Sequence, residues 1–288
     1  PTMQLLLFGY ALTLDVDRVP TLILDRDGTP QSRDLIQRFD GSRFFEIAGY
    51  TREEVDTQFG CRSWVELAAL IERAQPDIAI QSTCSRIVDA MGEITMLARH
   101  GVHVISIAEE MAYPACSSPA FAEELHWLAV SKGVAVLGTG VNPGFVLDLL
   151  VVTLSAVCAD IESVTATRSN DLSPYGSSVL ASQGVGLSPQ AFAQGVRDGT
   201  VVGHLGFPES MHLIAAALGW DIERIEQTRE PVVSRVRRET PLATVQPGQV
   251  AGCHHRAVAY CAGRAVITLD HPQQVHPQLE GVATGDRI

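Results

Sequence analysis

Small polar residues and two glutamates follow three short apolar segments of the chain, at points where parallel strands would end. Ser82, Thr83 and Cys84 follow the first segment, Glu109 and Glu110 the second, and a glycine-rich turn the third. In an open parallel sheet, ligands bind beyond the carboxyl ends of the strands. Small hydroxyl groups at this edge suit hydrogen bonds to a ribose or a nicotinamide, and they equally suit capping of the following helices. Both interpretations remain open from the residues alone.

The glycine-rich turn lies in residues 134–150, VAVLGTGVNPGFVLDLL, between an apolar strand and an apolar helix. Glycine at such a junction lets a phosphate or a nicotinamide approach the backbone, and free N–H groups at a helix start favour an anion. Gly138 and Gly140 are therefore candidate cofactor-binding residues. The same glycines can instead make a tight turn with no ligand, so a nucleotide site is one of two alternatives.

Glu109 and Glu110 are the candidates for acid–base chemistry. A carboxylate at a strand end, shielded from water and beside a second carboxylate, has a raised proton affinity, which suits a general acid or base. The alternative is a pair of solvated acids at the start of a helix, where the helix dipole favours negative charge. The spacing alone slightly favours this alternative.

Histidines and cysteines late in the chain raise the question of a metal site. The residues concerned are His254, His255, His271, His276, Cys253 and Cys261. Their spacing is not that of a known zinc site, and adjacent histidines on a strand face opposite sides of it. We therefore predict no metal. The six cysteines are scattered without a CxxC pair, which indicates reduced thiols and a cytoplasmic protein.

The composition is typical of a globular protein, because 46% of the 288 residues are hydrophobic and 19% are charged. The net charge of −12 repels nucleic acid and anionic membranes, so we expect the protein to bind neither. The apolar run at residues 5–14 is far shorter than the roughly 20 residues that span a bilayer.

From residue 57 to residue 150 the chain alternates helix and strand. We predict helices at 64–74, from about 87, and at 119–133, with strands at 77–83, 102–107 and 134–137. Helices that separate short apolar strands imply crossovers and a parallel sheet. The pattern predicts an α/β fold in which residues 57–150 form an incomplete Rossmann-like sheet, a partial dinucleotide-binding domain.

Residues 151–288 are predicted to form a substrate-binding and catalytic α+β domain with a mostly antiparallel sheet. Strands are expected at 162–168, 231–238, 254–261 and 264–270, the last two joined as a hairpin through Gly263. Residues 169–187 are expected to form a long polar loop. Helices are expected after Ser188 and Pro208. Residues 1–56 form a separate segment, with a strand at 20–25, a turn, and a helix at 31–39.

Six motifs between residues 57 and 288 resemble the amine-forming branch of the dihydrodipicolinate-reductase-like dehydrogenases, which includes 2,4-diaminopentanoate dehydrogenase and the native amine dehydrogenases. In chain order they are PDIAIQSTCS, GVHVISIAEEMAYP, GVAVLGTGVNPGFVLDLL, TRSNDLSPYG, GTVVGHLGFPES and ITLDHPQQVHPQLEGVATGD. The resemblance implies an enzyme that uses NAD or NADP to interconvert a small amine with an imine, or with a ketone plus ammonia. It leaves a homodimer open.

The resemblance also implies roles for individual residues. The family's catalytic carboxylate lies in the VISIAEE motif, which places it on Glu109 with Glu110 beside it. Its implied role is to hold and deprotonate the ammonium or carbinolamine while the nicotinamide exchanges a hydride with the carbon. The candidate cofactor-binding residues are Ser82, Thr83, Cys84, Ile107, Ala108, Gly138, Gly140, Asn142 and Pro143. The candidate substrate residues are Arg168, Asn170, Asp171, Tyr175 and His204.

Residues 1–55 resemble a different family, the start of an ABC-type exporter permease. They stand where the dehydrogenase family has a strand, a Gly-x-Gly-x-x-Gly loop and a helix, and the chain stops at Ile288, before that family's last elements. We therefore expect weak or absent cofactor binding, with residues 20–39 as a substitute for the missing strand and helix. The alternative functions are a membrane-transport component and a non-catalytic remnant.

Overall fold

The computed structural model describes residues 18–24, 37, 45–50 and 64–288. The chain divides into two compact units. The first comprises Pro1–Cys84, Val88–Ala108 and Ala120–Leu137, and the second comprises Ser85–Ile87, Glu109–Pro119 and Gly138–Ile288. The domain boundaries at residues 56 and 150 remain predictions; the second unit also takes in two short pieces before residue 120.

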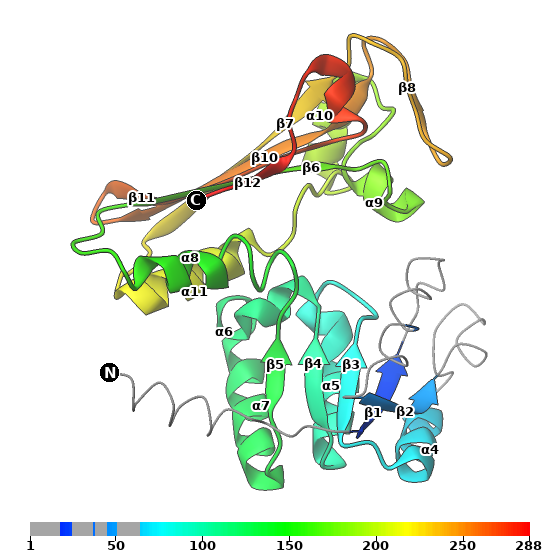
Figure 1. Ribbon diagram of the computed structural model, residues 1–288. Coiled ribbons are helices and arrows are strands. Elements are labelled where there is room, and N and C mark those ends of the chain that lie inside the picture. Colours follow the sequence, from blue (N-terminus) through cyan, green and yellow to red (C-terminus); the bar gives the residue numbers. More distant parts are fainter. Residues whose placement is uncertain (1–17, 25–36, 38–44, 51–63) are drawn as a thin grey trace, which may run out of the picture. The chain divides into compact units, whose positions relative to one another are not determined.

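The first unit is built on sheet A, five strands in the order β2–β1–β3–β4–β5 (Figure 1). The strands are β1 (Val19–Leu24), β2 (Phe45–Tyr50), β3 (Ile78–Gln81), β4 (His103–Ser106) and β5 (Val136–Gly138). β1 pairs in parallel with β2 and β3, and β3 pairs in parallel with β4. Between β2 and β5 the chain forms α4 (Trp64–Ala74), α5 (Ile87–Arg99) and α7 (Pro119–Lys132), as crossovers in a parallel sheet require.

Apolar side chains on both the strands and the helices form the core of the first unit. Leu22 and Ala79 of the strands are fully buried, as are Ile94 and Leu97 of α5. Burying a leucine or isoleucine stabilises a fold by roughly 1.5–3 kcal/mol. The predicted α/β class, the parallel sheet and the helix at 64–74 are confirmed.

The strand predicted at 20–25 is confirmed as β1, which pairs with β3 inside sheet A. The helix predicted at 31–39 lies outside the described residues, except for Gln37, which is helical. The apolar run at 5–14 also lies outside them. In the part of the chain that the structure describes, no helix has the length and apolar character needed to cross a membrane.

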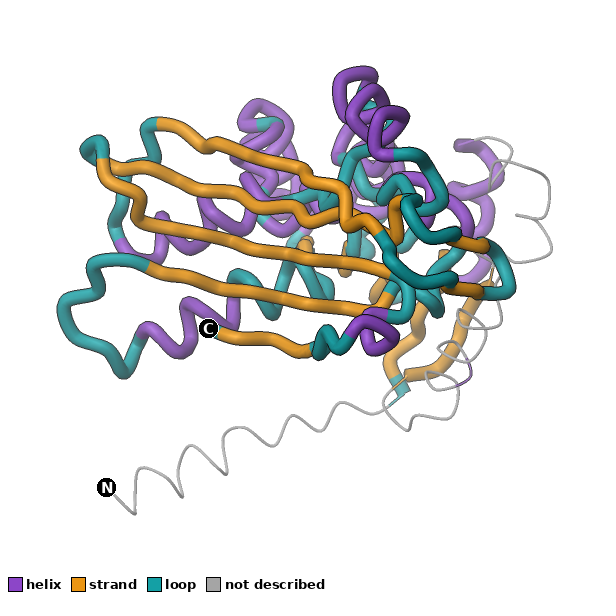
Figure 2. The backbone as a smooth tube through the Cα atoms, turned by 90° about the horizontal axis from the view of Figure 1, so that it is seen from above, coloured by secondary structure: helices purple, strands orange, loops and turns teal. Residues whose placement is uncertain are grey.

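The second unit is built on sheet B, five strands in the order β12–β6–β11–β10–β7, whose longer members lie side by side in Figure 2. The strands are β6 (Val164–Asp171), β7 (Arg224–Val233), β10 (Val250–Cys261), β11 (Arg264–Gln274) and β12 (Gly285–Arg287). β10 pairs antiparallel with β7 and β11, β12 pairs antiparallel with β6, and β6 pairs in parallel with β11. The mostly antiparallel sheet and the β10–β11 hairpin through Gly263 are therefore confirmed.

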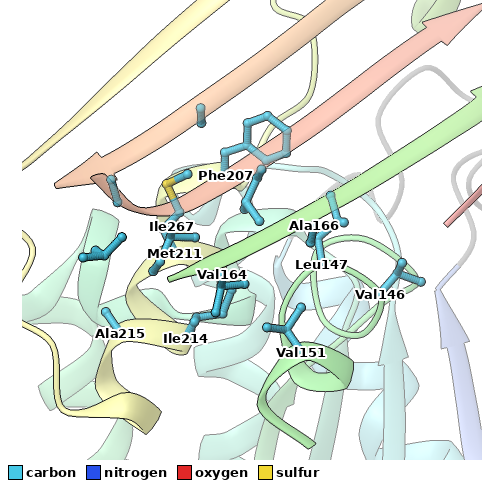
Figure 3. Close-up of a cluster of buried hydrophobic side chains, with 14 residues drawn as sticks. Val146, Leu147, Val151, Val164, Ala166, Phe207, Met211, Ile214, Ala215 and Ile267 are labelled. Atoms are coloured by element: carbon cyan, nitrogen blue, oxygen red, sulfur yellow. The ribbon is translucent and has the colours of Figure 1, made fainter. Parts of the chain in front are cut away.

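Helices α8 (Leu149–Ser155) and α11 (Phe207–Leu218) pack against one face of sheet B (Figure 3). Val151 of α8 and Met211 and Ile214 of α11 form a buried cluster with Ala166 and Ile267 of the strands. Further helices of the unit are η1 (Glu109–Ala112), α6 (Pro114–Ser117), α9 (Ser177–Ser182), α10 (Pro189–Asp198) and η2 (Pro277–Glu280). Two short strands, β8 (Arg238–Glu239) and β9 (Thr244–Val245), pair with each other.

Several element boundaries differ from the prediction: β10 begins at Val250 and β11 extends to Gln274, each four residues beyond the predicted bound. β7 begins at Arg224, because the segment RIEQTREPVV pairs with β10 along its length, and its charged residues had hidden this strand in the sequence. The polar loop expected at 169–187 contains the end of β6 and all of α9. The helix expected after Gly144 begins only at Leu149, where Asp148 caps it.

Five of the six cysteines lie in the described part of the chain. They are Cys84, Cys116, Cys158, Cys253 and Cys261, and no disulfide bond joins any of these five. This agrees with the reduced state predicted from their scattered spacing.

Candidate active site

Glu109 opens helix η1, close behind the end of β4. The Ser106 hydroxyl accepts the N–H of Ala108 (3.2 Å) and so fixes the turn between the two elements. Burial raises the pKa of the half-buried Glu109 carboxyl, hydrogen bonds from its own N–H and from Ser85 lower it, and the charge of Glu110 raises it further. The net effect is a raised pKa, so Glu109 holds a proton at a higher pH than an exposed glutamate does.

Glu110 makes backbone contacts of its own. Its Oε2 accepts the N–H of Ile87, the first residue of α5, at 2.7 Å, and its N–H donates to the Ser85 carbonyl at 3.3 Å. The helix dipole favours a carboxylate in such a place. One alternative for both glutamates was an acid at the start of a helix. Glu110 occupies such a position, at the start of α5, although Glu110 itself belongs to η1. Its catalytic role remains a prediction.

Gly206 is the point at which three segments meet beside Glu109. This residue precedes α11 and has a φ of +92°, a conformation that glycine adopts without strain. A Cβ atom here would lie 2.2 Å from Cγ of Pro143 and 3.3 Å from Cβ of Glu109. The start of α11, the loop after β5 and η1 therefore converge at a position where a side chain has no room.

Gly138 and Gly140 serve the packing of the chain itself. A Cβ atom at Gly138 would lie 1.7 Å from the carbonyl oxygen of Met111, and one at Gly140 would lie 2.7 Å from that of Pro143. Both positions thus require glycine without any ligand. These contacts favour the tight-turn alternative for the glycine-rich motif.

Asp148 occupies the helix start that follows this motif. Its buried carboxylate accepts the N–H groups of Gly144 (2.7 Å) and Leu149 (2.6 Å) and the hydroxyl of Ser210 (2.8 Å). The expected anion-binding helix start is therefore corrected, because the chain supplies its own anion there.

Asn142 carries two buried side-chain atoms, Oδ1 and Nδ2, that have no hydrogen-bond partner among the described residues. A cis peptide bond joins Asn142 to Pro143. Buried amide groups left unpaired cost free energy, which a ligand with matching groups recovers. A nicotinamide carboxamide offers one donor group and one acceptor, so Asn142 fits the cofactor that the resemblance implies.

The face of sheet B that packs on α11 changes from apolar to polar along its strands. Beyond the apolar cluster, the strand register places Arg229, His255, His271 and Arg168 in one row across β7, β10, β11 and β6. The His271 Nδ1–H donates to the Arg168 carbonyl (2.6 Å), and Nδ1 of His255 accepts the backbone N–H of His204 (3.0 Å). We call these four residues the histidine row.

Burial keeps the histidines of this region neutral. It lowers the pKa of His255 to about 3 and that of His271 to about 4, and it lowers the pKa of His204 well below the usual value. The positive charges of nearby arginines act in the same direction. The imidazoles therefore act as uncharged hydrogen-bonding groups at any pH near neutrality.

Arg168 and Asn170 alternate along β6 and so face the same side of sheet B. Nη1 of Arg168 lies 3.4 Å from a carboxylate oxygen of Asp286 in β12. The Asn170 amide donates to the Tyr175 hydroxyl at 3.4 Å, whereas its Oδ1 is buried and has no partner in the described part of the chain. On β6, at one end of the histidine row, the Arg168 guanidinium and the unpaired Oδ1 of Asn170 therefore lie on the same side of the sheet.

His204 covers this row from the segment that leads to α11. Its ring meets the rings of His271 and Phe207 edge-on, with centroids 5.0 Å and 4.9 Å apart. Its Nε2 is buried and lacks a hydrogen-bond partner among the residues described. The structure therefore brings His204 against His255 and His271 of the histidine row, which also contains Arg168.

Asp171 faces the opposite side of β6 from these candidates. Its Oδ1 accepts the backbone N–H groups of Ser173 (2.8 Å) and His276 (2.9 Å). Burial alone would raise the pKa of this carboxyl, but the hydrogen bonds outweigh burial and lower it. Asp171 holds this loop, and contact with a substrate remains a prediction for it.

The cofactor candidates of the first unit follow the carboxyl ends of β3 and β4. The Thr83 hydroxyl accepts a hydrogen bond from Gln81 (2.7 Å) and donates to the buried Glu93, and the Ser106 hydroxyl donates to Gln81. Thr83 is thus part of a closed network that holds this edge of the sheet. The other candidates there are Ser82, Cys84, the exposed Ile107 and the buried Ala108.

Sequence reasoning chose Arg168 but missed Ser85, Gly206 and the other three members of the histidine row. Gly206 could have been suspected, because it directly precedes the helix start Phe207-Pro208. His255 and His271 had been weighed only as metal ligands, whereas strand register was needed to place them opposite each other. The residues described contain no group of three or more side chains arranged to hold a metal ion.

The fold fits one class of protein. A parallel α/β sheet with polar residues beyond its strand ends, in a chain that also forms an α+β unit, is the architecture of a Rossmann-type oxidoreductase. The chain is an NAD(P)-dependent, amine dehydrogenase-like oxidoreductase, as its relatives show.

Residues 145–288 match the family model of the 2,4-diaminopentanoate dehydrogenase C-terminal domain. Over 240 residues the chain is 40% identical to 2,4-diaminopentanoate dehydrogenase from Acetoanaerobium sticklandii. The aligned region covers 82% of this chain and 68% of the relative. The chain therefore belongs to the 2,4-diaminopentanoate dehydrogenase family. These findings confirm the dehydrogenase resemblance and give no support to the permease resemblance of residues 1–55.

Two solved structures show the same fold. An amine dehydrogenase from Mycobacterium smegmatis is 20% identical, with a TM-score of 0.74 over 95% of this chain and 82% of that one. GenD2 from gentamicin A biosynthesis, solved in complex with NAD, is 14% identical, with a TM-score of 0.50 over 94% of this chain and 67% of that one.

Proposed function

We propose that this protein interconverts the amine of a small amino acid with an imine, or with a ketone plus ammonia, and that Glu109 is the acid–base group. 2,4-Diaminopentanoate, the compound in the relative's name, is the first substrate candidate. The Glu109 carboxyl carries the proposal, because it is half-buried, has a raised pKa, and lies beside Gly206 where η1 meets the loop carrying Pro143.

Bound NAD or NADP would supply the hydride exchange at the amine carbon. As a carboxylate, Glu109 takes a proton from the substrate ammonium, which frees the nitrogen lone pair for the C=N bond. In the reverse direction the Glu109 carboxylic acid returns that proton to nitrogen. A base works best when its pKa lies near the working pH, and the burial that raises the pKa of Glu109 moves it that way.

The cofactor assignment is supported by Asn142, whose buried amide atoms match a carboxamide. Pro143, Gly138 and Gly140 shape the loop that holds Asn142. Ser82, Cys84, Ile107 and Ala108 would contact the cofactor through backbone or side-chain atoms. Thr83 would hold the loop after β3 in place through its hydrogen bond to Glu93.

Arg168 supports an amino acid as the substrate. Its guanidinium can form a charge-assisted hydrogen bond with a carboxylate, and Asp286 shows that an acid fits beside it. The open atoms of Asn170 and His204 offer further polar contacts in the same row. We propose that these residues bind the substrate carboxylate and orient its amine.

The catalytic proposal is tested by Glu109→Gln in an assay of NAD(P)+-dependent oxidation of 2,4-diaminopentanoate and of simple amines. Loss of the acid–base group should lower kcat by about 100- to 10,000-fold, the usual contribution of such a group. Glu124→Gln, at an exposed site on α7, is the matched control and should keep full activity. Unchanged turnover in Glu109→Gln would move the catalytic role elsewhere.

The substrate proposal is tested by Arg168→Met in the same assay. Losing a charged hydrogen bond costs about 1.5–3 kcal/mol, so kcat/KM for the carboxylate substrate should fall roughly 10- to 100-fold. The rate with a simple amine that lacks a carboxylate should change little. Equal losses for both substrates would contradict a carboxylate contact.

The homodimer, the cytoplasmic location and weak cofactor binding remain predictions. Fluorescence titration with NADH and NADPH measures the last of these, and low-micromolar affinity for either would show it wrong. The membrane-transport alternative has no support, because the family model and the relative that match this chain are those of a dehydrogenase.

A further inference from the structure

The segment Ser85–Ile87 belongs to the second unit, although its neighbours on both sides belong to the first. Two hydrogen bonds join it to the start of η1: the Glu110 N–H donates to the Ser85 carbonyl (3.3 Å), and the Ile87 N–H donates to Glu110 Oε2 (2.7 Å). These bonds bring the Ser85 hydroxyl near the Glu109 carboxyl, whose pKa it lowers. Both glutamates are thus attached to the segment that links β3 to α5.

The two attachments differ in what they do to Glu109. The Ser85 hydroxyl reaches the Glu109 carboxyl itself, so it restrains where the carboxyl points and favours its charged form. Glu110 sits beside Glu109 as a second carboxylate, held there by the start of α5, and its negative charge disfavours a second charge nearby. Ser85 and Glu110 therefore act on Glu109 in opposite directions.

Other titratable groups near η1 come from α6 and α11. Burial and the charges of Glu209 and Glu110 raise the pKa of the Cys116 thiol to about 11, so it is uncharged near neutrality. Burial raises the pKa of the Glu209 carboxyl, which accepts a hydrogen bond from the Ser117 hydroxyl. Nδ1 of His212 in α11 lies 3.3 Å from the Cys116 sulfur and 2.7 Å from the Pro208 carbonyl oxygen.

Arg86, the residue after Ser85 in the chain, is exposed to solvent. Of all these charged groups, Glu110 is the one whose charge contributes to the pKa shift of Glu109.

We propose that Ser85 and Glu110 are positioning residues that orient the Glu109 carboxyl and join it to the loop between β3 and α5. Ser85 directs the carboxyl through its hydroxyl, and Glu110 fixes η1 to the start of α5 while holding a negative charge beside the carboxyl. The inference rests on the proposed role of Glu109 as the acid–base group. It assigns Glu110 a function without contact with the substrate.

Two variants separate charge from hydrogen bonding. Glu110→Gln removes the charge but keeps an oxygen that accepts the Ile87 N–H, so the cap of α5 survives. Ser85→Ala removes the hydroxyl but leaves the Ser85 backbone carbonyl in place. The first change should lower the pKa of Glu109, and the second should raise it.

The test is the pH dependence of kcat/KM for amine oxidation in the full chain, whose acidic limb reports the base in the free enzyme. Relative to wild type, Glu110→Gln should move this limb to lower pH and Ser85→Ala to higher pH, each by about half a pH unit or more. Ser85→Thr keeps a hydroxyl and should restore the wild-type limb. Thermal melting of each variant checks that the fold is kept.

A merely structural role would lower kcat or the melting temperature without moving the limb in opposite directions. Limbs that stay in place, or that shift the same way in both variants, overturn the inference. If either variant fails to fold, Ser85→Thr against Ser85→Cys supplies the same comparison of hydroxyl against weak donor. Failure of the proposed function shows separately, as unchanged turnover in Glu109→Gln.

Discussion

Two groups of polar residues in this protein differ in whether their buried atoms are paired, and the difference indicates which group is suited to binding a ligand. At the ends of β3 and β4, Gln81, Thr83, Glu93 and Ser106 bond to one another within the first unit. In the second unit, Asn142, Asn170 and His204 keep buried polar atoms without a partner among the described residues. Because buried polar groups are normally paired, a closed network stabilises a fold, whereas an open one offers its atoms to something else.

The largest effect should come from opening the closed network with Glu93→Ala. Its Oε2 accepts from the Gln81 amide and the Thr83 hydroxyl, so removing it deletes two hydrogen bonds at this edge of the sheet and should cost about 2 kcal/mol or more of unfolding free energy. Denaturant unfolding followed by circular dichroism measures this loss. Glu124→Ala, at an exposed site, is the control and should cost little. Unfolding curves that match for the two variants would remove the distinction between the networks.

A different outcome is expected for Asn142→Ala in the open network. Its amide atoms have no partner in the described chain to lose, so the melting temperature should change little. The dissociation constant for NADH or NADPH should rise about 10-fold, as the loss of one or two neutral hydrogen bonds implies. Fluorescence titration checks the affinity. A large drop in melting temperature with unchanged cofactor affinity would mean that Asn142 is structural.

The smallest effect concerns pH and the histidine row. His255 has a pKa of about 3 in the folded protein, against the usual value of 6.5, so as the pH falls the unfolded chain takes up its proton first. Above pH 6.5, His255 is neutral in both the folded and the unfolded protein, so it does not change the free energy of unfolding. As the pH falls from 6.5 towards 3, the unfolded chain binds this proton and the folded protein loses stability.

One pH unit below 6.5, this loss is at most about 1.4 kcal/mol for each such histidine. The melting temperature of His255→Gln should therefore fall less between pH 7 and pH 5 than that of wild type, whereas the exposed control His126→Gln should follow wild type. Equal slopes for all three proteins would show that His255 is already free to take up a proton in the folded state.

Much of the fold could be predicted from the sequence, because apolar periodicity and caps are local signals. The helix at 64–74 was predicted with its bounds, and Ser188 marked the start of α10. β7 was misplaced, since its charged exposed residues mask the strand until its pairing with β10 is known. Secondary structure is therefore predictable where burial is one-sided and clear, and less so on a strand with a polar face.

For the site, the family resemblance implied roles for Glu109 and Asn142, and these roles remain predictions. The sequence could not separate Glu109 from Glu110, because adjacent residues share the same local signal. The hydrogen bond from Ile87 to Glu110 separates them, and it links residues 23 positions apart. The role of the glycines was also undecided, until Met111 and Pro143 were seen to fill the space that a side chain would need.

By itself, the sequence determined the α/β class, the family resemblance of residues 57–288 and the presence of two adjacent carboxylates, Glu109 and Glu110, after a predicted strand. These follow from periodicity and from motifs whose residues are close along the chain. Only the tertiary structure decided which carboxyl is buried, which polar atoms lack partners and which histidines share a row. Burial, pairing and register depend on segments that folding brings together from distant parts of the chain, and no local pattern encodes them.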